Sequence, residues 1–309
     1  MCEEIDIVRL NFSEGSLLIL DATLFIIMYG VALNLKWQDF QAVIQRPRSP
    51  LLGLFSQFLV LPALTLGLVY VVEPCPSIAL GMFLVAACPG GNISNFMSLM
   101  AKANVALSVS LSAVSTMLAI FMTPLNFAFW SGLYPPAQAI MEEINMDPVA
   151  IFVKILMILA IPLALGMWTT YRFPDFSARI AKPLNKLSIV IFGGYVVAAL
   201  ASNFDFFLRY VQFVILIVAA HNAIALLSGY TVASLGRLPV RDRRTLAIET
   251  GIQNSGVALV LIFGPLFEGL GGMAMIAALW GIWHIVAGLS LSTIWSRMPV
   301  KEKVAASEM

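Results

Sequence analysis

Long apolar stretches fill most of this chain, and each is separated from the next by a short polar or Pro/Gly-rich stretch. The hydrocarbon core of a bilayer requires about 20 apolar residues per helix. Runs such as Ile151–Gly166 do not alternate between apolar and polar residues, as barrel strands would. The pattern predicts an all-α polytopic membrane protein with nine transmembrane helices, at about 16–35, 50–72, 77–100, 104–133, 148–171, 187–204, 206–235, 245–264 and 267–296.

The composition favours the same class of protein. Of the 309 residues, 60% are hydrophobic and 11% are charged, whereas a soluble domain usually has about 45–50% and about 25%. The net charge of +1 offers no basic surface, so no nucleic acid is expected as a partner. Cys2, Cys75 and Cys88 are too few and too scattered to predict a disulfide framework or a cysteine metal site.

The basic residues indicate the orientation in the membrane. Of 18 basic residues, the N-terminus and one alternate set of connections hold only Arg9 and Arg209, and Lys154 lies inside a segment. By the positive-inside rule, the other, basic set of connections is cytoplasmic. We therefore expect an extracellular segment 1–15 and a cytoplasmic tail 298–309 in a multi-pass protein of the plasma membrane, which is the inner membrane if the host is a bacterium. The cytoplasmic set is Lys36, Arg46, Arg48, Lys102, Arg172, Arg179, Lys182, Lys186, Arg237, Arg241, Arg243, Arg244, Arg297, Lys301 and Lys303.

Two apolar segments contain a polar, glycine-rich interruption near the middle. Segment 77–100 contains Cys88–Asn95 (CPGGNISN), and segment 245–264 contains Glu249–Gly256 (ETGIQNSG). Proline and adjacent glycines open a helix and leave backbone amides and carbonyls without partners. Hydrocarbon cannot satisfy these groups, so both interruptions must face protein or a watery cavity.

The two interruptions occupy equivalent positions in two copies of one unit. Segments five to nine form a five-helix unit with its break in the fourth helix. Segments one to four form the same unit without its first helix, inverted across the membrane. Inverted repeats with paired broken helices are the architecture of secondary transporters, whose site lies where the breaks cross. The alternative, that glycines only allow close helix packing, leaves the polar side chains at both breaks unexplained.

Glu249 is the only carboxylate that this segmentation puts near the middle of a span. An ionised carboxylate at that depth requires a cation. The candidate basic residues Lys102 and Arg244 lie at span ends, so a sodium ion or a proton is indicated. Ser94, Asn95 and Gln253 supply the oxygen ligands that a hard cation prefers. The alternative is a protonated glutamic acid hydrogen-bonded to a neighbouring helix.

Several other polar residues allow two interpretations. Ser108, Ser112 and Ser115 form one helical stripe, yet serine also bonds to a carbonyl of its own helix. Gln57 could bind an ion or join two helices.

The remaining signals concern the ligand and the chemistry. His221 and His284 lie on separate segments without metal-site spacing, so no transition metal is expected. The half-helix after Gly91 would point free amides into the site, which favours an anion. No GxSxG, P-loop or HExxH motif is present, so we do not expect an enzyme.

The two interrupted motifs and the run NVALS at 104–108 closely resemble the sodium–bile acid symporter family, which includes the apical and hepatic bile acid transporters. The resemblance covers about 16–297. It implies a core domain and a panel domain that move against each other to give alternating access, in the nine-helix form that lacks the first helix of ten-helix members. The implied panel helices are 16–35, 148–171 and 187–204, and the other six form the core.

The resemblance also implies two sodium sites and a substrate site. The first sodium site would use Ser94, Asn95, Ser108, Ser112 and Glu249. The second would use Gln57, Glu249, Gln253 and the backbone carbonyls of Thr250 and Ile252. The substrate would contact Asn92, Ile93, Asn254 and His284. Substrates of the family include bile acids, other steroid conjugates and small carboxylates such as pantoate, and the sequence does not choose among them.

Together these features predict a secondary active transporter that carries an organic anion with two sodium ions and needs no other cofactor. Its oligomeric state is open, and a monomer is compatible with everything above. Two alternatives stay open: a proton-coupled or uncoupled carrier on the same fold, and a receptor that binds an anion without moving it.

Overall fold

The computed structural model describes residues 2–7, 22, 25–35, 37–91, 93–143, 148–202, 204–263, 267 and 270–299. Within these ranges the protein is helical and has no strand apart from isolated bridge residues, such as Gly90 and Gln253, which confirms the all-α class. Most of the predicted extracellular segment 1–15 and of the predicted tail 298–309 lies outside the described residues.

Five helices of the described part are long and apolar enough to span a bilayer. The first is continuous over Arg48–Val72 and comprises α4 (Arg48–Phe55), the π-helix η1 (Ser56–Val60) and α5 (Leu61–Val72). The other four lie within α8 (Val105–Gly132), α10 (Pro148–Arg172), α12 (Phe204–Leu235) and α15 (Gly271–Arg297).

Two further apolar segments are each divided into a pair of helices, as the interrupted motifs predict. The first pair is α6 (Pro76–Ala87) and α7 (Ile93–Met100), and the second is α13 (Val240–Gly251) and α14 (Ser255–Phe263). The unwound stretches are shorter than the motifs suggest, because Glu249, Ser94 and Asn95 all lie within helices. Our expectation that these residues belong to open backbone is therefore wrong.

The remaining helices connect or flank these spans. They are α1 (Cys2–Ile7), α3 (Trp37–Gln45), α9 (Pro135–Glu143) and α11 (Pro174–Ser202), with a helical stretch at 25–32. Helix α11 begins well before the predicted boundary at 187, because its first turns carry exposed charged residues that a search for apolar stretches leaves out.

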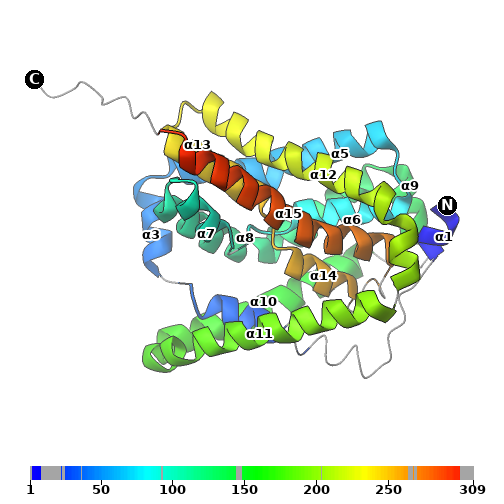
Figure 1. Ribbon diagram of the computed structural model, residues 1–309. Helices are drawn as coiled ribbons and strands as arrows, with labels where there is room; N and C mark the ends of the chain where they lie inside the picture. The colour runs from blue at the N-terminus through cyan, green and yellow to red at the C-terminus, as the bar shows by residue number, and fades with distance from the viewer. Residues whose placement is uncertain are drawn as a thin grey trace, which may run out of the picture.

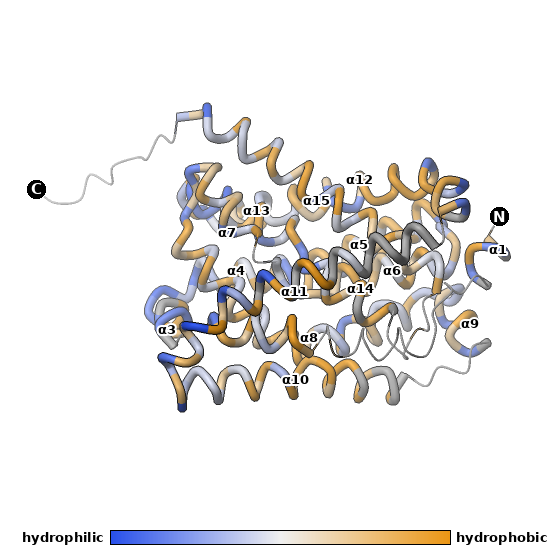
Figure 2. Tube along the Cα trace, turned by 60° about the horizontal axis from the view of Figure 1, so that its bottom comes forward, coloured by the Kyte–Doolittle hydropathy of each residue, from blue (hydrophilic) through white to orange (hydrophobic). Residues whose placement is uncertain are grey.

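The helices form successive layers. In Figure 1, α10 and α11 run along the bottom and α12 along the top, with α8, α6 and α15 between them. The contacts follow this order, from α11 to α10, α8, α6, α15 and α12. Helix α6 lies in the middle and is buried at every position from Ser77 to Ala87. Figure 2 shows hydrophilic residues gathered at the two ends of the helices, with hydrophobic residues between them, as a bilayer requires.

Buried polar groups close one end of the molecule, which we call the Asp242 end. Arg244 is 3% exposed and donates to the carbonyls of Ala101, Trp295 and Met298. These carbonyls lie at the C-terminal ends of α7 and α15, where a cation is favourable. The Arg244 side chain, which extends from α13, thus links the ends of α7 and α15.

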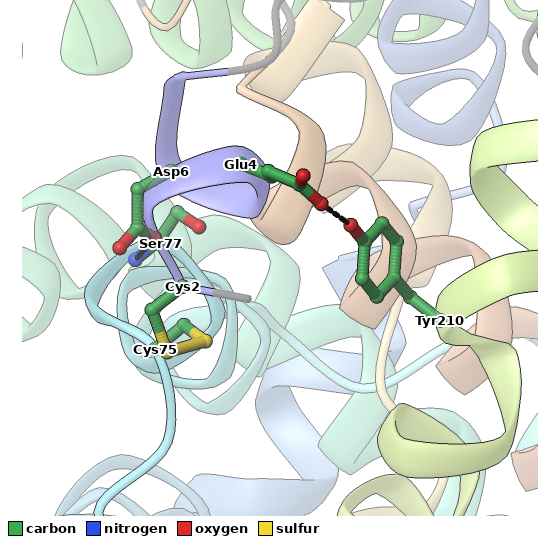
Figure 3. Close-up of a disulfide and its surroundings, with 6 residues drawn as sticks. All are labelled: Cys2, Glu4, Asp6, Cys75, Ser77 and Tyr210. Carbon is green, nitrogen blue, oxygen red and sulfur yellow. Dashed lines mark hydrogen bonds between the residues drawn. A yellow bond between two sulfur atoms is a disulfide. The ribbon is translucent and has the colours of Figure 1, made fainter.

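Helix α1 docks at the opposite end, through a disulfide between Cys2 and Cys75 (Figure 3). Our expectation from the cysteine count is wrong here, because sequence spacing does not reveal which segments meet in space. Ile5 is 1% exposed, and the Asp6 carboxylate accepts a 2.8 Å hydrogen bond from the backbone of Ser77.

Glu4 fixes α1 to the start of α12. It accepts a hydrogen bond from the Tyr210 hydroxyl (Figure 3) and lies 3.5 Å from Arg209. The Tyr210 hydroxyl, and after it the Arg209 guanidinium, hold the pKa of Glu4 below its usual value. Helix α1 therefore contacts the beginnings of α6, α12 and α15, and we call this the α1 end.

Candidate functional site

The site lies where the two interrupted segments cross. Gly90 and Gln253 form an antiparallel bridge. The amide of Gly91 donates to the carbonyl of Ile252 at 2.7 Å, and the amide of Asn254 donates to the carbonyl of Pro89 at 2.8 Å. The two unwound stretches thus satisfy part of each other's backbone, as the absence of water in a bilayer core demands.

Glu249 lies beside this crossing on α13 and is 2% exposed. Its Oε1 accepts hydrogen bonds from Ser94, at 2.5 Å, and from Ser108. Its Oε2 accepts one from Ser112 at 3.0 Å. Among the described residues, no Lys or Arg forms an ion pair with this carboxylate. The negative charge is therefore surrounded by neutral oxygen atoms.

Two helices aim these hydroxyls at one point. Ser108 and Ser112 are four residues apart on α8, so they share a face. Ser94 lies in the first turn of α7, and its hydroxyl is also 3.3 Å from that of Ser112. Ser115 does not join them, because it donates to the carbonyl of Ser112 on its own helix.

The donor set suits a sodium ion. The serine hydroxyls give their hydrogens to Glu249 and keep lone pairs that can face a cation. Asn95 Oδ1 is buried and makes no hydrogen bond within the described structure. A buried acceptor of this kind requires a partner, and a hard cation is one that prefers oxygen.

A second group of polar atoms lies on the other side of Gly90. The Gln57 amide donates to Gln253 Oε1 at 3.5 Å, and the Gln253 amide donates to the carbonyl of Thr250 at 2.9 Å. A Cβ added at Gly90 would lie 3.0 Å from Glu249 Oε2 and 3.4 Å from Gln57 Nε2. The glycine therefore leaves open the space between the carboxylate and this second group.

Sequence reasoning missed three features of this region. Gln57 lies in the π-helix η1, and π-helices often occur at functional sites. Ser56 beside it accepts a 3.1 Å hydrogen bond from Thr250. Asn222 of α12 donates to the carbonyl of Gly251 at 2.7 Å. The sequence does show these polar residues in otherwise apolar segments. It does not show which groups they bond to.

The four residues expected to contact substrate have different outcomes. Asn92 lies outside the described residues. Ile93 begins α7 and is half-buried, and the Asn254 side chain accepts from the amide of Val257 at 3.3 Å. His284 is 4% exposed, and its Nδ1 is buried without a hydrogen bond in the described part of the chain. In the described part of the chain, Glu249 accepts its hydrogen bonds from Ser94, Ser108 and Ser112 and not from Asn254 or His284, so the substrate site stays a prediction.

Residues 22–209 match the Sodium Bile acid symporter family. The chain belongs to this family. It is 31% identical, over 92% of its own length and 84% of the relative's, to the "Uncharacterized sodium-dependent transporter YocS" of Bacillus subtilis (strain 168). It is 28% identical, over 90% of its length and 67% of the relative's, to the "Probable sodium/metabolite cotransporter BASS1, chloroplastic" of Arabidopsis thaliana. It is 30% identical to the human "P3 protein" over 82% of its length, and it spans 52% of that relative.

Membership of the sodium bile acid symporter family confirms the resemblance of the motifs. The family is one of symporters, and the relatives of Bacillus subtilis and Arabidopsis thaliana are named as transporters, so the chain is a membrane transporter and not an enzyme. Their names support sodium as the coupling ion and an organic substrate, without identifying that substrate.

Proposed function

We propose that this symporter-family protein carries an organic anion together with sodium ions by alternating access. The observation that carries the proposal is Glu249, a buried carboxylate that receives three serine hydroxyls and no cationic side chain among the described residues. A charge at this depth is expensive without a counter-ion. A sodium ion would supply the missing charge.

Two sodium ions would share Glu249 from opposite sides. Both oxygens of Glu249 accept hydrogen bonds from the serine group, to which we assign the first ion with Asn95. Oε2 faces the space beside Gly90, to which we assign the second ion, with Gln57, Gln253 and the carbonyls of Thr250 and Ile252. With a monovalent anion, two ions would carry one net charge inward, which adds about 2.3 kcal/mol of driving force per 100 mV.

The architecture we propose has nine spans in two inverted repeats, the first without its first helix. The paired interruptions α6/α7 and α13/α14 and their crossing support it. In this proposal α10, α11 and the helix around 25–32 form the panel domain, and the remaining spans form the core domain. Because α10 contacts both α11 and α8, the sliding surface would lie between α10 and α8.

We further propose that the α1 end faces the outside and the Asp242 end the cytoplasm. The Cys2–Cys75 disulfide supports this orientation, because disulfides persist in oxidising compartments. It joins the N-terminus to the connection before α6, and the distribution of basic residues assigns both to the outside. The basic residues Arg48, Arg243 and Arg244 lie at the other end.

The substrate we propose is an organic anion such as a bile acid, another steroid conjugate or a small carboxylate. The names of the relatives support this range, since the family is named for bile acids and BASS1 for a metabolite. The start of α7 at Ile93, beside the crossing, adds a positive helix end that favours an anion.

The testing experiment is thermal melting of the purified protein in sodium or potassium chloride, alone and with a panel of taurocholate, pantoate and other organic anions. We expect sodium to raise the melting temperature more than potassium, and one anion to raise it further only in sodium, because a ligand that binds the folded state stabilises it. An equal response to sodium and potassium would contradict the proposal. Stabilisation by acid instead would point to a proton-coupled carrier.

Binding must then be followed by transport. In proteoliposomes, an inward sodium gradient should drive accumulation of the stabilising anion. Sodium-dependent binding without accumulation would favour the receptor and contradict symport.

A further inference from the structure

A cavity with both polar and apolar walls opens at the Asp242 end of the molecule, between the starts of α4, α8 and α13. It has a volume of about 240 Å³, and its lining includes Arg46, Ser49, Asn104 and Asp242. Arg46 is exposed to solvent, whereas Asp242 is only 9% exposed. Water therefore screens the positive charge of Arg46 more than the negative charge of Asp242.

Asp242 is held in place by two neighbouring elements. Its Oδ2 accepts a 2.7 Å hydrogen bond from Ser49, and its Oδ1 accepts a 2.8 Å hydrogen bond from the Asn104 side chain. Both donors line the cavity with it. The carboxylate is thus fixed at the cavity wall, where its charge acts on any ion that enters.

Polar oxygen atoms continue from this cavity to Glu249 along the facing sides of α8 and α13. On α13, Asp242, Thr245 and Glu249 are three and then four residues apart, so they lie on one face. Asn104 and Ser108 are likewise four residues apart at the start of α8.

The two faces meet in successive hydrogen bonds. Asn104 bonds to Asp242 through its side chain, and its backbone amide and carbonyl bond to the Thr245 hydroxyl at 2.9 and 3.0 Å. One helical turn further, Ser108 bonds to Glu249. Seven residues of helix cover about 10 Å, so a sodium ion would meet an oxygen atom at every step between the cavity and Glu249.

We propose that this row of oxygen atoms is the inner route of the sodium ion, and that Asp242 is the residue that attracts the ion at its cytoplasmic entrance. The inference rests on the proposed function and deepens it, because it names the path by which the ion moves between Glu249 and the cytoplasm. Asp242 is a positioning residue on the route and not a ligand of the bound ion.

The route can be probed with a single reactive thiol. Cys2 and Cys75 are bonded to each other and Cys88 is buried, so a Thr245→Cys variant supplies the reactive site. The reagents are the cationic 2-aminoethyl methanethiosulfonate and the neutral methyl methanethiosulfonate. Ser131→Cys, equally buried at the far end of α8, is the matched control.

We expect Thr245→Cys to react faster than Ser131→Cys, and sodium but not potassium to slow the reaction. Adding Asp242→Asn should lower, by about tenfold, the ratio of the labelling rate of the cationic reagent to that of the neutral reagent. This is the effect of one unit charge about 6 Å away, at a dielectric constant between those of a protein surface and of water. An inert Thr245→Cys, equal slowing by potassium, or an unchanged ratio would overturn the route. If Thr245→Cys does not fold, Ser110→Cys in the cavity wall reports the same ratio.

A separate measurement distinguishes this inference from the proposed function. Asp242→Asn should keep the sodium-dependent rise in melting temperature, since the bound ion lies at Glu249. Loss of that rise would make Asp242 part of the binding site and overturn its role on the route. If the unsubstituted protein itself shows no difference between sodium and potassium, the proposed function fails, whereas the ratio of labelling rates still reads the charge of Asp242 without sodium.

Discussion

Replacing Glu249 by Gln is the most direct test of the sodium site, because it removes one charge and changes almost no volume. The serine hydroxyls can reorient, so that one accepts from the new amide while the others still donate to its oxygen. We therefore expect Glu249→Gln to fold. We also expect it to lose sodium binding, since a neutral amide no longer balances the charge of the ion.

The magnitude follows from the surroundings of the carboxylate. Glu249 is 2% exposed, so little bulk water screens it. Two unit charges about 4 Å apart interact by about 4 kcal/mol at an effective dielectric constant of 20. At 1.4 kcal/mol per factor of ten, the substitution should weaken sodium binding by about 1,000-fold, which is enough to abolish sodium-driven uptake.

The assay is a sodium titration of the melting temperature at constant ionic strength, with potassium as the replacement ion. The melting temperature of the unsubstituted protein should rise with the logarithm of sodium concentration, as mass action requires. That of Glu249→Gln should not change. Glu142→Gln is the matched control, because Glu142 is exposed on α9, outside the site.

A sodium-specific rise retained in Glu249→Gln would refute the reasoning. The carboxylate would then be a protonated side chain that the serines stabilise. If size-exclusion chromatography shows that the variant does not fold, Ser112→Ala removes one oxygen and keeps the charge. It should weaken sodium binding without abolishing it, and unchanged binding would count against the site.

Three further predictions concern the surroundings of the site. Gly90→Ala should abolish sodium-dependent stabilisation, because its Cβ would lie 3.0 Å from Glu249 Oε2, whereas Gly67→Ala, with open space around its Cβ, should not. A reducing agent should lower the melting temperature of the unsubstituted protein, because loss of the disulfide lowers the free energy of unfolding by about 2–4 kcal/mol. The same reagent should leave the melting temperature of Cys2→Ser unchanged. Arg244→Met should lower the free energy of unfolding, measured by thermal melting, by about 2–3 kcal/mol, because buried carbonyls at the ends of α7 and α15 lose their donor.

The sequence predicts the helical class and the pairs of broken helices well, since both depend on local composition. Stretches such as 104–133 and 206–235 agree with α8 and α12 to within two residues. Proline and glycine at Pro89 and Gly90 also mark the first break correctly. These signals are local, so no knowledge of the tertiary contacts is needed to interpret them.

Tertiary contacts account for what the sequence does not reveal. The Cys2–Cys75 disulfide joins residues 73 positions apart, and neither cysteine lies in a distinctive motif. Ser115 falls on the same stripe as Ser108, yet it bonds to its own helix. The role of Asn104 at the cavity depends on Asp242, which is 138 positions away. Spacing along one helix cannot tell which side chains face a partner helix.

Helices, rather than open backbone, hold the charged and hydroxyl groups of this site. Glu249 is on α13, Ser94 on α7 and Ser112 on α8, so packed helices fix their positions. The unwound stretches have a different role, because they let two segments cross and leave room beside Gly90. Substitutions on the helices should therefore change the affinity for the sodium ion, whereas a larger residue at Gly90 should fill the space that the ion would occupy.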